Sequence, residues 1–498
     1  MSPETTILVA LLLPVLAAVS CLLLGGGLGR PNLRDIATPL IGACTFATVW
    51  RLAGDVLAGG RPELVLFEVL PGVELAFQVE PRGLLYGLVA SGLWIVTSIY
   101  AVGYMRGHHE QNQTRFFTFF ALSIFAALGI AFASNLFTLF LFYEALTLLT
   151  FPLVTHHGTD EARRAGRVYL GILLFTSISF LLFAILFTWR LTGTIEFTPG
   201  GILGAETSSG MVTVLLLLYA FGAGKAALMP FHRWLPNAMV APTPVSALLH
   251  AVAVVKAGVF AILKVVVYVF GLDLLGGSNA SLSLMTIASF TMLMAAVIAI
   301  RQDNLKARLA YSTISQLAYI VLGAAMATAT GVLAGGMQIA MHAAGKITLF
   351  FCAGAILVAT HKKKVSELDG LGRTMPWTFA AFFLASLSII GIPPLGGSWA
   401  KWYLMVGALE TGFAWQAAFL GVLMVSSLLA VFYLMPVVVR GFFATSPTAG
   451  PSGSAGGDRK PIAEAPFLCV APLVLTALLS LALFFVAGDL ASLLSFQT

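Results

Sequence analysis

Long apolar stretches separated by short polar loops fill most of this chain and determine its predicted architecture. A membrane-spanning helix needs about 20 predominantly apolar residues, and on that measure the pattern predicts fourteen helices. We expect them near residues 5–25, 34–58, 82–105, 114–131, 134–156, 164–190, 211–229, 244–270, 281–300, 305–327, 331–360, 376–391 with a continuation to 411, 413–440 and 464–487. The apolar runs are continuous rather than alternating, which excludes a membrane β-barrel. The chain is therefore predicted to be an all-α polytopic membrane protein.

Composition and charge support this prediction. Of the 498 residues, 59% are hydrophobic and 10% are charged, whereas a soluble domain carries about 25% charge. If the N-terminus lies outside, most loop Lys and Arg residues fall on the inner side, and only Arg51, Arg61, Arg82 and Arg190 fall outside. This asymmetry is the positive-inside signal. It predicts a multi-pass membrane protein with both termini extracytoplasmic, and it explains the net charge of +6 without a nucleic-acid partner. We expect the membrane to be a bacterial cell membrane.

Two interrupted spans suggest how the helices are organised. Pro230 begins a proline-rich break after Lys225, and Pro393 and Pro394 break the chain at GIPPLGGSWAK, just before Lys401. Paired interruptions in corresponding halves indicate inverted repeats. We therefore predict five parts, which are residues 1–113 (three helices and an extracytoplasmic hairpin within 59–81), 114–270 and 281–440 (two inverted five-helix repeats, each with a broken helix), 441–463 (a flexible cytoplasmic linker) and 464–498 (a C-terminal helix).

Ionisable side chains stand inside the predicted spans, where each is costly. Glu144 lies near the middle of LFTLFLFYEALTLLTF, and four other spans contain Lys225, Lys256, Lys346 and Lys401. A lysine in hydrocarbon costs about 3 kcal/mol on insertion scales, so such residues mark function by default. Mapped onto the helices, these groups form a row at mid-membrane depth. A row of this kind with hydrated gaps is a proton wire, and we predict that role here.

The buried carboxylate and the lysines are expected to interact. An opposite charge within about 4–6 Å holds both groups ionised, and separating them shifts both pKa values. Pairing of Glu144 with Lys225 or Lys256 would therefore act as a switch, although Glu144 also fits a structural role in helix packing. Lys264, eight residues after Lys256, either extends the row or snorkels to the outer interface.

Histidines near these lysines are further candidates. His342 and Lys346 stand at i and i+4, so they share a helix face that should point into the bundle. His250 precedes Lys256 by six residues and is either a relay or a satisfied core residue. His232 beside the first break is equally open. We expect the remaining histidines to be solvated loop residues, although the first two could gather protons: His108, His109, His156, His157 and His361.

Cofactor chemistry has no sequence support in this chain. The cysteines Cys21, Cys44, Cys352 and Cys469 are scattered and form no C-x-x-C pair. No Walker A loop or dinucleotide fingerprint occurs. We therefore expect no metal site and no cofactor.

Four stretches together resemble one known family. They are FHRWLPNAMVAPTPVSALLHAVAVVKAGVF, DNLKARLAYSTISQLAYI, MHAAGKITLFFCAGA and GIPPLGGSWAKW. On these stretches the chain, from about residue 80 to 440, resembles the antiporter-like subunits shared by Mrp-type Na+/H+ antiporters, respiratory complex I and membrane-bound hydrogenases. Within this family it is most similar to the D-type subunits of Mrp antiporters.

The resemblance implies roles for individual residues. The family's functional positions fall on Glu144 (fifth helix), Lys225 (seventh), His250 and Lys256 (eighth), Lys346 (eleventh) and Lys401 (twelfth). It also implies fourteen helices, inverted repeats, two half-channels joined by a polar axis, and function inside a larger complex. Gln316 departs from the pattern, because complex I subunits often have histidine there. This departure weakens a histidine relay at that point.

The sequence thus predicts a transporter subunit that moves protons in a multisubunit Na+/H+ antiporter. Protons would reach the Lys225–Lys256 region, pass along the midplane and leave near Lys401, with sodium as counter-ion by resemblance only. The expected partners are other hydrophobic subunits, H+, Na+ and membrane lipid. One alternative is a proton-pumping subunit of a redox-driven complex. Another is a membrane scaffold whose lysines bind neighbouring subunits.

Overall fold

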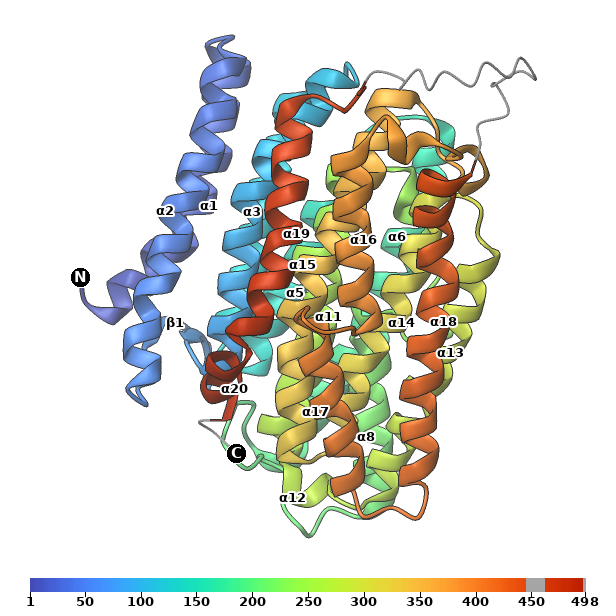
Figure 1. The fold of residues 1–498 in the computed structure, drawn as a ribbon. Helices are drawn as coiled ribbons and strands as arrows, with labels where there is room; N and C mark the ends of the chain where they lie inside the picture. The colour runs from blue at the N-terminus through green and yellow to red at the C-terminus, as the bar shows by residue number, and fades with distance from the viewer. Residues whose placement is uncertain (445–461, 496–498) are drawn as a thin grey trace.

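The computed structural model describes residues 1–444 and 462–495, and it is a bundle of long helices (Figure 1). Most of the predicted linker 441–463 lies outside the described residues. Within the described part, ten helices are long and apolar enough to cross a membrane. The all-α polytopic fold is confirmed, and each of the fourteen expected segments falls on helix.

The first helices carry a small β-hairpin. This part comprises α1 (Pro3–Cys21, continued by a π-helical turn to Gly27), α2 (Pro31–Leu57), β1 (Glu63–Leu70), β2 (Val73–Gln78) and α3 (Pro81–Gly107). The two strands pair antiparallel, with Glu63 opposite Gln78 and Leu70 opposite Val73, so the predicted hairpin is present. Asn135 Nδ2 donates to the Glu74 carbonyl at 2.9 Å, which fixes β2 to the start of α5.

The next helices lead to the first interruption. They are α4 (Gln113–Phe132), α5 (Leu136–Val154), α6 (Asp160–Thr176), α7 (Phe183–Thr192) and α8 (Ser209–Gly222), with α6 and α7 joined by a π-helical turn. Asn135, Thr159 and Ser208 cap α5, α6 and α8 by accepting a backbone N–H three residues on. Such caps satisfy donors that a helix start leaves unpaired.

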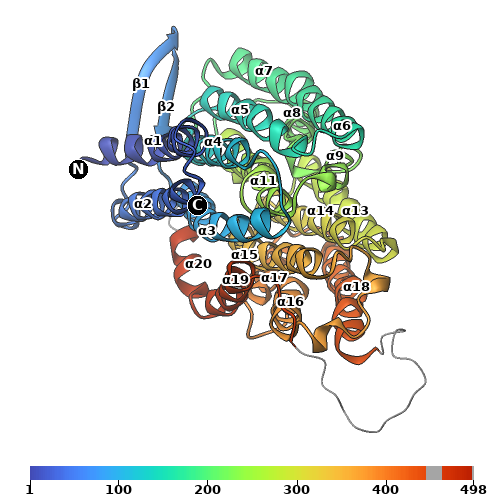
Figure 2. The same ribbon diagram turned by 90° about the horizontal axis from the view of Figure 1, so that it is seen from above.

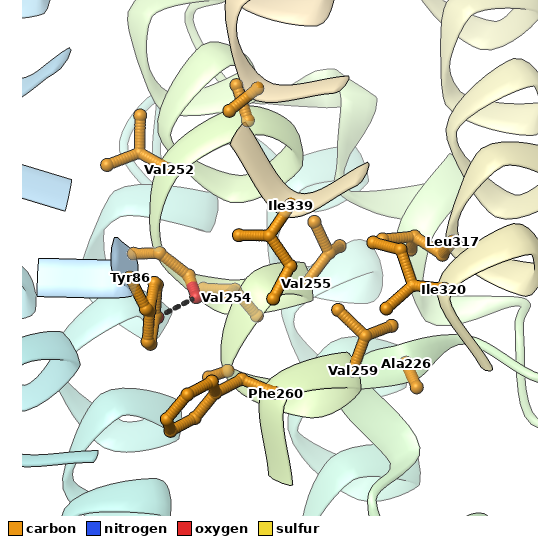
Figure 3. Close-up of a cluster of buried hydrophobic side chains, with 14 of the residues drawn as sticks. Tyr86, Ala226, Val252, Val254, Val255, Val259, Phe260, Leu317, Ile320 and Ile339 are labelled. Atoms are coloured by element: carbon orange, nitrogen blue, oxygen red, sulfur yellow. Dashed lines mark hydrogen bonds between the residues drawn. The ribbon is translucent and has the colours of Figure 1, made fainter. Parts of the chain in front are cut away.

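The first interruption converts one span into short pieces. After α8 come a 3₁₀ turn (Gly224–Ala226), α9 (Trp234–Asn237), α10 (Thr243–Ala247), a π-helical turn (Leu248–Val252) and α11 (Val254–Val265). Backbone groups released at such a break must be satisfied by protein. Trp234 Nε1 donates to the Gly224 carbonyl at 3.0 Å, and the Tyr86 hydroxyl donates to the Ala253 carbonyl at 2.8 Å (Figure 3).

The remaining helices complete the bundle. They are α12 (Leu272–Leu275), α13 (Asn279–Arg301), α14 (Leu305–Ala325), α15 (Ala329–Thr360), α16 (Pro376–Ile390), α17 (Gly397–Glu410), α18 (Gln416–Phe443), α19 (Phe467–Phe485) and α20 (Ala487–Ser495). The second predicted break separates α16 from α17. Seen from above, α11, α14 and α15 lie in the interior of the bundle, and α19 covers α15 beside α3 (Figure 2).

Both termini lie on the side of the β-hairpin (Figure 1). The opposite end carries residues 108–112 after α3, residues 155–159 after α5 and residues 361–375 after α15. Several Lys and Arg residues cluster there, so we call it the basic end. The positive-inside rule predicts that the basic end is cytoplasmic.

Gly258 on α11 allows the closest approach to the Lys225 turn. A Cβ at this position would lie 2.1 Å from Ala226 N and 2.4 Å from the Lys225 carbonyl carbon. We expect Gly258→Ala to lower the free energy of unfolding by about 1–3 kcal/mol, because overpacking forces backbone shifts. Denaturant titration of the purified assembly measures this effect.

Gly421→Ala on α18 is the matched control, since its added methyl group would meet nothing within 4 Å. It should be neutral or slightly stabilising, because alanine favours helix over glycine. Equal stability of the two variants would contradict the packing argument.

Candidate functional site

Lys225 is fully buried in the 3₁₀ turn and is held by α5. Its Nζ donates to the Tyr143 carbonyl at 2.8 Å and to Thr147 Oγ1 at 2.6 Å, and it lies 3.3 Å from the centre of the Tyr143 ring. The Lys225 backbone N–H donates to the Tyr143 hydroxyl at 3.0 Å. The lysine therefore has three kinds of partner on one turn of α5: a carbonyl, a hydroxyl and an aromatic face.

Glu144 stands beside these partners without touching the lysine. Both of its carboxylate oxygens are buried, and neither has a hydrogen-bond partner among the described residues. It forms none of the ion pairs found within 4 Å in the described chain, although Lys225 is near enough for Coulombic interaction. The expected Glu144–Lys225 contact is thus not made in this structure. A buried carboxylate without a partner is costly, so a hydrogen-bond or ion-pair partner that moved toward Glu144 would be stabilised there.

The next two lysines lie on α11 and α15. Lys256 Nζ and His342 Nδ1 are hydrogen-bonded at 2.7 Å. Lys346 Nζ donates to Ser312 Oγ at 2.6 Å and to the Leu309 carbonyl at 3.3 Å. His342 and Lys346 are both buried, as their i, i+4 spacing predicts. Lys256 is therefore linked to Lys346 through α15, which carries both His342 and Lys346.

Lys401 lies at the second interruption. Its Nζ donates to the Ile390 carbonyl at 2.8 Å and to Ser427 Oγ at 2.8 Å, and it is 4.8 Å from the centre of the Tyr319 ring. A cavity of about 540 Å³ reaches it between α17 and α18. Lys225 and Lys401 thus share one arrangement. Lys225 stands at the start of the first interruption and Lys401 just after the second, and each faces a tyrosine ring. This arrangement supports the inverted repeats, whose relation stays a prediction.

A polar stripe on α14 connects Lys346 with Lys401. Ser312 binds Lys346, Gln316 accepts from Gln338 at 2.9 Å, and Tyr319 faces Lys401. The three α14 residues stand at i, i+4 and i+7, so they lie on one face of a buried helix. Sequence reasoning noted Gln316 only as a departure from a family pattern. The helical spacing of these three polar residues was the sequence signal that could have predicted the stripe.

The other predicted site residues lie at the breaks. His250 belongs to the π-helical turn Leu248–Val252. Pro230 follows a cis peptide bond from Met229, and the Pro393–Pro394 bond is also cis. All three prolines thus stand where the helices are interrupted.

A second buried charge network lies near the hairpin end and was not predicted. Lys264 Nζ forms an ion pair with Glu80 at 3.4 Å and also donates to the Ala133 carbonyl. Tyr268 donates to Glu80, and Arg82 donates to the Tyr268 hydroxyl at 3.1 Å. Lys264 is 2% exposed, so it does not snorkel, and Arg82 is 3% exposed rather than a solvated loop residue. The second lysine on the span 244–270, Lys264, was the sequence signal for this network.

One of the loop histidines, His156, differs from expectation. His156 is 4% exposed, packed edge-to-face against Phe116. Burial lowers its pKa to about 4, and the nearby Arg115 and His157 charges act in the same direction. The expectation that His156 is solvated is therefore wrong, because the turn after α5 folds under α4.

Known proteins are similar to this chain in sequence and in fold. The model of a family described as "NADH:quinone oxidoreductase/Mrp antiporter, TM" matches residues 133–429. NADH-quinone oxidoreductase subunit N of Desulforudis audaxviator is 32% identical over 383 residues, covering 76% of this chain and 74% of that protein. A putative antiporter subunit, mnhA2, of Staphylococcus epidermidis is 29% identical over 83% of this chain. The chain spans only 53% of that relative's length.

A solved structure gives the same result for the fold. A chain of the Mrp complex from Dietzia sp. DQ12-45-1b superposes with a TM-score of 0.83 at 23% sequence identity. The match covers 98% of this chain and 96% of that one. Relatives named for antiporters and relatives named for quinone oxidoreductases are thus both similar to this chain in sequence, and a chain of an Mrp complex shares its fold.

Proposed function

We propose, on the premise that this chain belongs to the NADH:quinone oxidoreductase/Mrp antiporter transmembrane family, that it is the proton-translocating subunit of a multisubunit Na+/H+ antiporter. Protons exchange along the midplane row of Glu144, Lys225, Lys256, Lys346 and Lys401, with His250 and His342 as intermediate stations. The observation that carries this proposal is the row itself. Its lysines are 0–7% exposed inside an apolar bundle, and each has internal hydrogen-bond partners.

The partners suggest how the row moves a proton. Each lysine is held by oxygen or imidazole acceptors, which fix the position of its amine. Glu144 lies beside the Lys225 partners without contacting the ammonium group. A small movement that brings the two charges together would favour ionisation of both, and separation would favour neutral forms. This motion is the proposed gate.

A redox-driven complex is the second candidate, since a quinone oxidoreductase subunit is among the similar proteins. The row would be the same, but electron transfer elsewhere would drive it. Copurification distinguishes the two: small hydrophobic partners alone favour the antiporter, and flavin or iron–sulfur partners favour the redox complex. A scaffold role fits less well, because lysines that bind other subunits should face outward, and these are buried within the chain.

Lys225→Ala and Glu144→Ala test the proposal in the assembled complex. Each should lower Na+-dependent proton flux in sealed vesicles at least about 100-fold, because a positioned proton carrier contributes that much to a transfer rate. Lys364→Ala and Glu206→Ala, at exposed positions, are the matched controls and should keep normal flux. Intact flux in both test variants would end the proposal.

A further inference from the structure

A cavity of about 870 Å³ opens at the basic end of the bundle. Loops after α3, α5 and α15 surround it, and Tyr104 and Ala353 reach into it from α3 and α15. The buried row lies deeper, beyond the start of α10. The cavity therefore brings water into the bundle on the side that the positive-inside rule makes cytoplasmic.

Three titratable groups meet at the wall of this cavity. Glu110 Oε1 lies 3.1 Å from His108 Nδ1, and Glu110 Oε2 lies 3.5 Å from His157 Nδ1. The Glu110 side chain is 7% exposed, whereas the His108 and His157 side chains are 30% and 32% exposed. Water thus reaches the two imidazoles, and the carboxylate is held behind them.

Charges from the other packed elements also face this cluster. They are Asp160, Glu161 and Arg164 on α6, Lys306 on α14, and His361, Lys362 and Lys363 after α15. Lys306 Nζ donates to the Ala241 carbonyl at 2.6 Å, just before α10. Burial lowers the pKa of His157, and Lys306, His108 and Lys363 lower it further, while Glu110 opposes them. An imidazole in this balance releases a proton more readily than a free histidine.

Polar side chains continue from the cluster toward the row. The His108 ring stacks on Tyr104 with centroids 5.6 Å apart, and Tyr104 lies close to Thr243 at the start of α10, whose buried hydroxyl has no hydrogen-bond partner among the described residues. Ser246 follows on the same short helix, and its buried hydroxyl has no hydrogen-bond partner among the described residues. From Thr243 to Lys256 the chain rises roughly 20 Å at 1.5 Å per residue. The polar groups thus lead from the cavity to mid-membrane depth.

We propose that Glu110, His108 and His157 form a proton-binding site at the mouth of this cavity, through which the midplane row exchanges protons with water at the basic end. His108 donates its Nδ1–H to the carboxylate, and His157 Nδ1 lies beside the other carboxylate oxygen, so the Nε2 atom of either ring can take a proton from water. The carboxylate stabilises the resulting imidazolium, and Nε2 later returns that proton to cavity water. This inference rests on the proposed function and assigns one end of the path.

The pH dependence of uptake from this face tests the site. Vesicles of the assembled complex, with the basic end outward, are loaded with NaCl or KCl and diluted into choline buffer of varied pH. An internal pH dye then reports proton entry. Glu110→Gln should move the midpoint of uptake about one pH unit lower, so that tenfold more protons are needed, while the rate at acidic pH stays normal. His157→Gln should shift it in the same direction, and adding it to Glu110→Gln should cause no further shift.

The controls separate this inference from the proposed function. His109→Asn, at an exposed neighbouring position that does not line the cavity, should leave the midpoint unchanged. An unshifted midpoint in both Glu110→Gln and His157→Gln, with uptake still abolished by Lys225→Ala, overturns the site alone. Normal uptake in Lys225→Ala overturns the proposed function instead. If Glu110→Gln fails to assemble, His157→Gln decides the matter, because the His157 side chain is 32% exposed and contributes little to packing.

Discussion

Lys256→Ala is expected to abolish proton flux through the assembled complex, by at least about 100-fold. Lys256 is fully buried on α11, immediately after the break, and its ammonium is joined to His342 on α15 at 2.7 Å. Removing the amine deletes the hydrogen bond that joins Lys256 on α11 to His342 on α15. Proton flux in sealed vesicles, compared with the yield of intact complex, measures the loss.

His342→Gln separates positioning from proton transfer at this pair. A glutamine carbonyl can still accept from the lysine, but it cannot take up a proton at neutral pH. Flux should fall about tenfold or more if the imidazole carries the proton, and should stay normal if it only orients Lys256. Val255→Ala is the control, since it shortens a neighbouring buried side chain (Figure 3) without removing charge. A Lys256→Ala complex with flux like this control would contradict the role of Lys256.

The positions of the buried lysines could be predicted from the sequence, but their partners could not. A charged residue inside an apolar run can be recognised from the sequence alone, and so can a pair of prolines. The carbonyls that bind Lys225 and Lys401 belong to Tyr143 and Ile390, and any residue has a carbonyl. Only the folded chain shows which carbonyls the ammonium groups reach.

Glu144 illustrates a second limit. Its depth in the membrane follows from its place in the span, whereas its distance from Lys225 depends on rotation of α5 by a fraction of a turn. Tyr143 and Thr147, at i and i+4, share the face that meets Lys225, and Glu144 is one position off that face. Apolar residues on all sides of α5 give no periodicity from which this rotation could be read.

The Glu80 network was missed because its members are far apart in the chain. Glu80 and Tyr268 are separated by 188 residues, and both Glu80 and Arg82 flank the predicted start of a span, where charges are ordinarily solvated. The hairpin and the loop before α8 cover this end and exclude water. Burial by a distant segment is a tertiary effect that local hydrophobicity does not encode.

Glu80→Ala is expected to destabilise the protein by about 3–5 kcal/mol, because it leaves Lys264 buried without its counter-charge. Both side chains of the pair are at most 4% exposed, so water cannot replace the lost carboxylate. Denaturant titration of the purified assembly measures the change in the free energy of unfolding. Glu63→Ala, at an exposed hairpin position, is the matched control and should stay within about 0.5 kcal/mol of the parent.

The double variant Glu80→Gln with Lys264→Met tests whether the loss comes from the unpaired charge. Methionine keeps most of the lysine's length without its charge, and glutamine keeps a hydrogen-bonding group for Tyr268. Replacing a buried ion pair by uncharged groups is often neutral, so the double variant should recover most of the stability that Glu80→Ala loses. If Glu80→Ala instead matches Glu63→Ala, the Glu80–Lys264 pair contributes no stability. If the double variant is as unstable as Glu80→Ala, packing of the carboxylate rather than its charge holds this end of α11 in place.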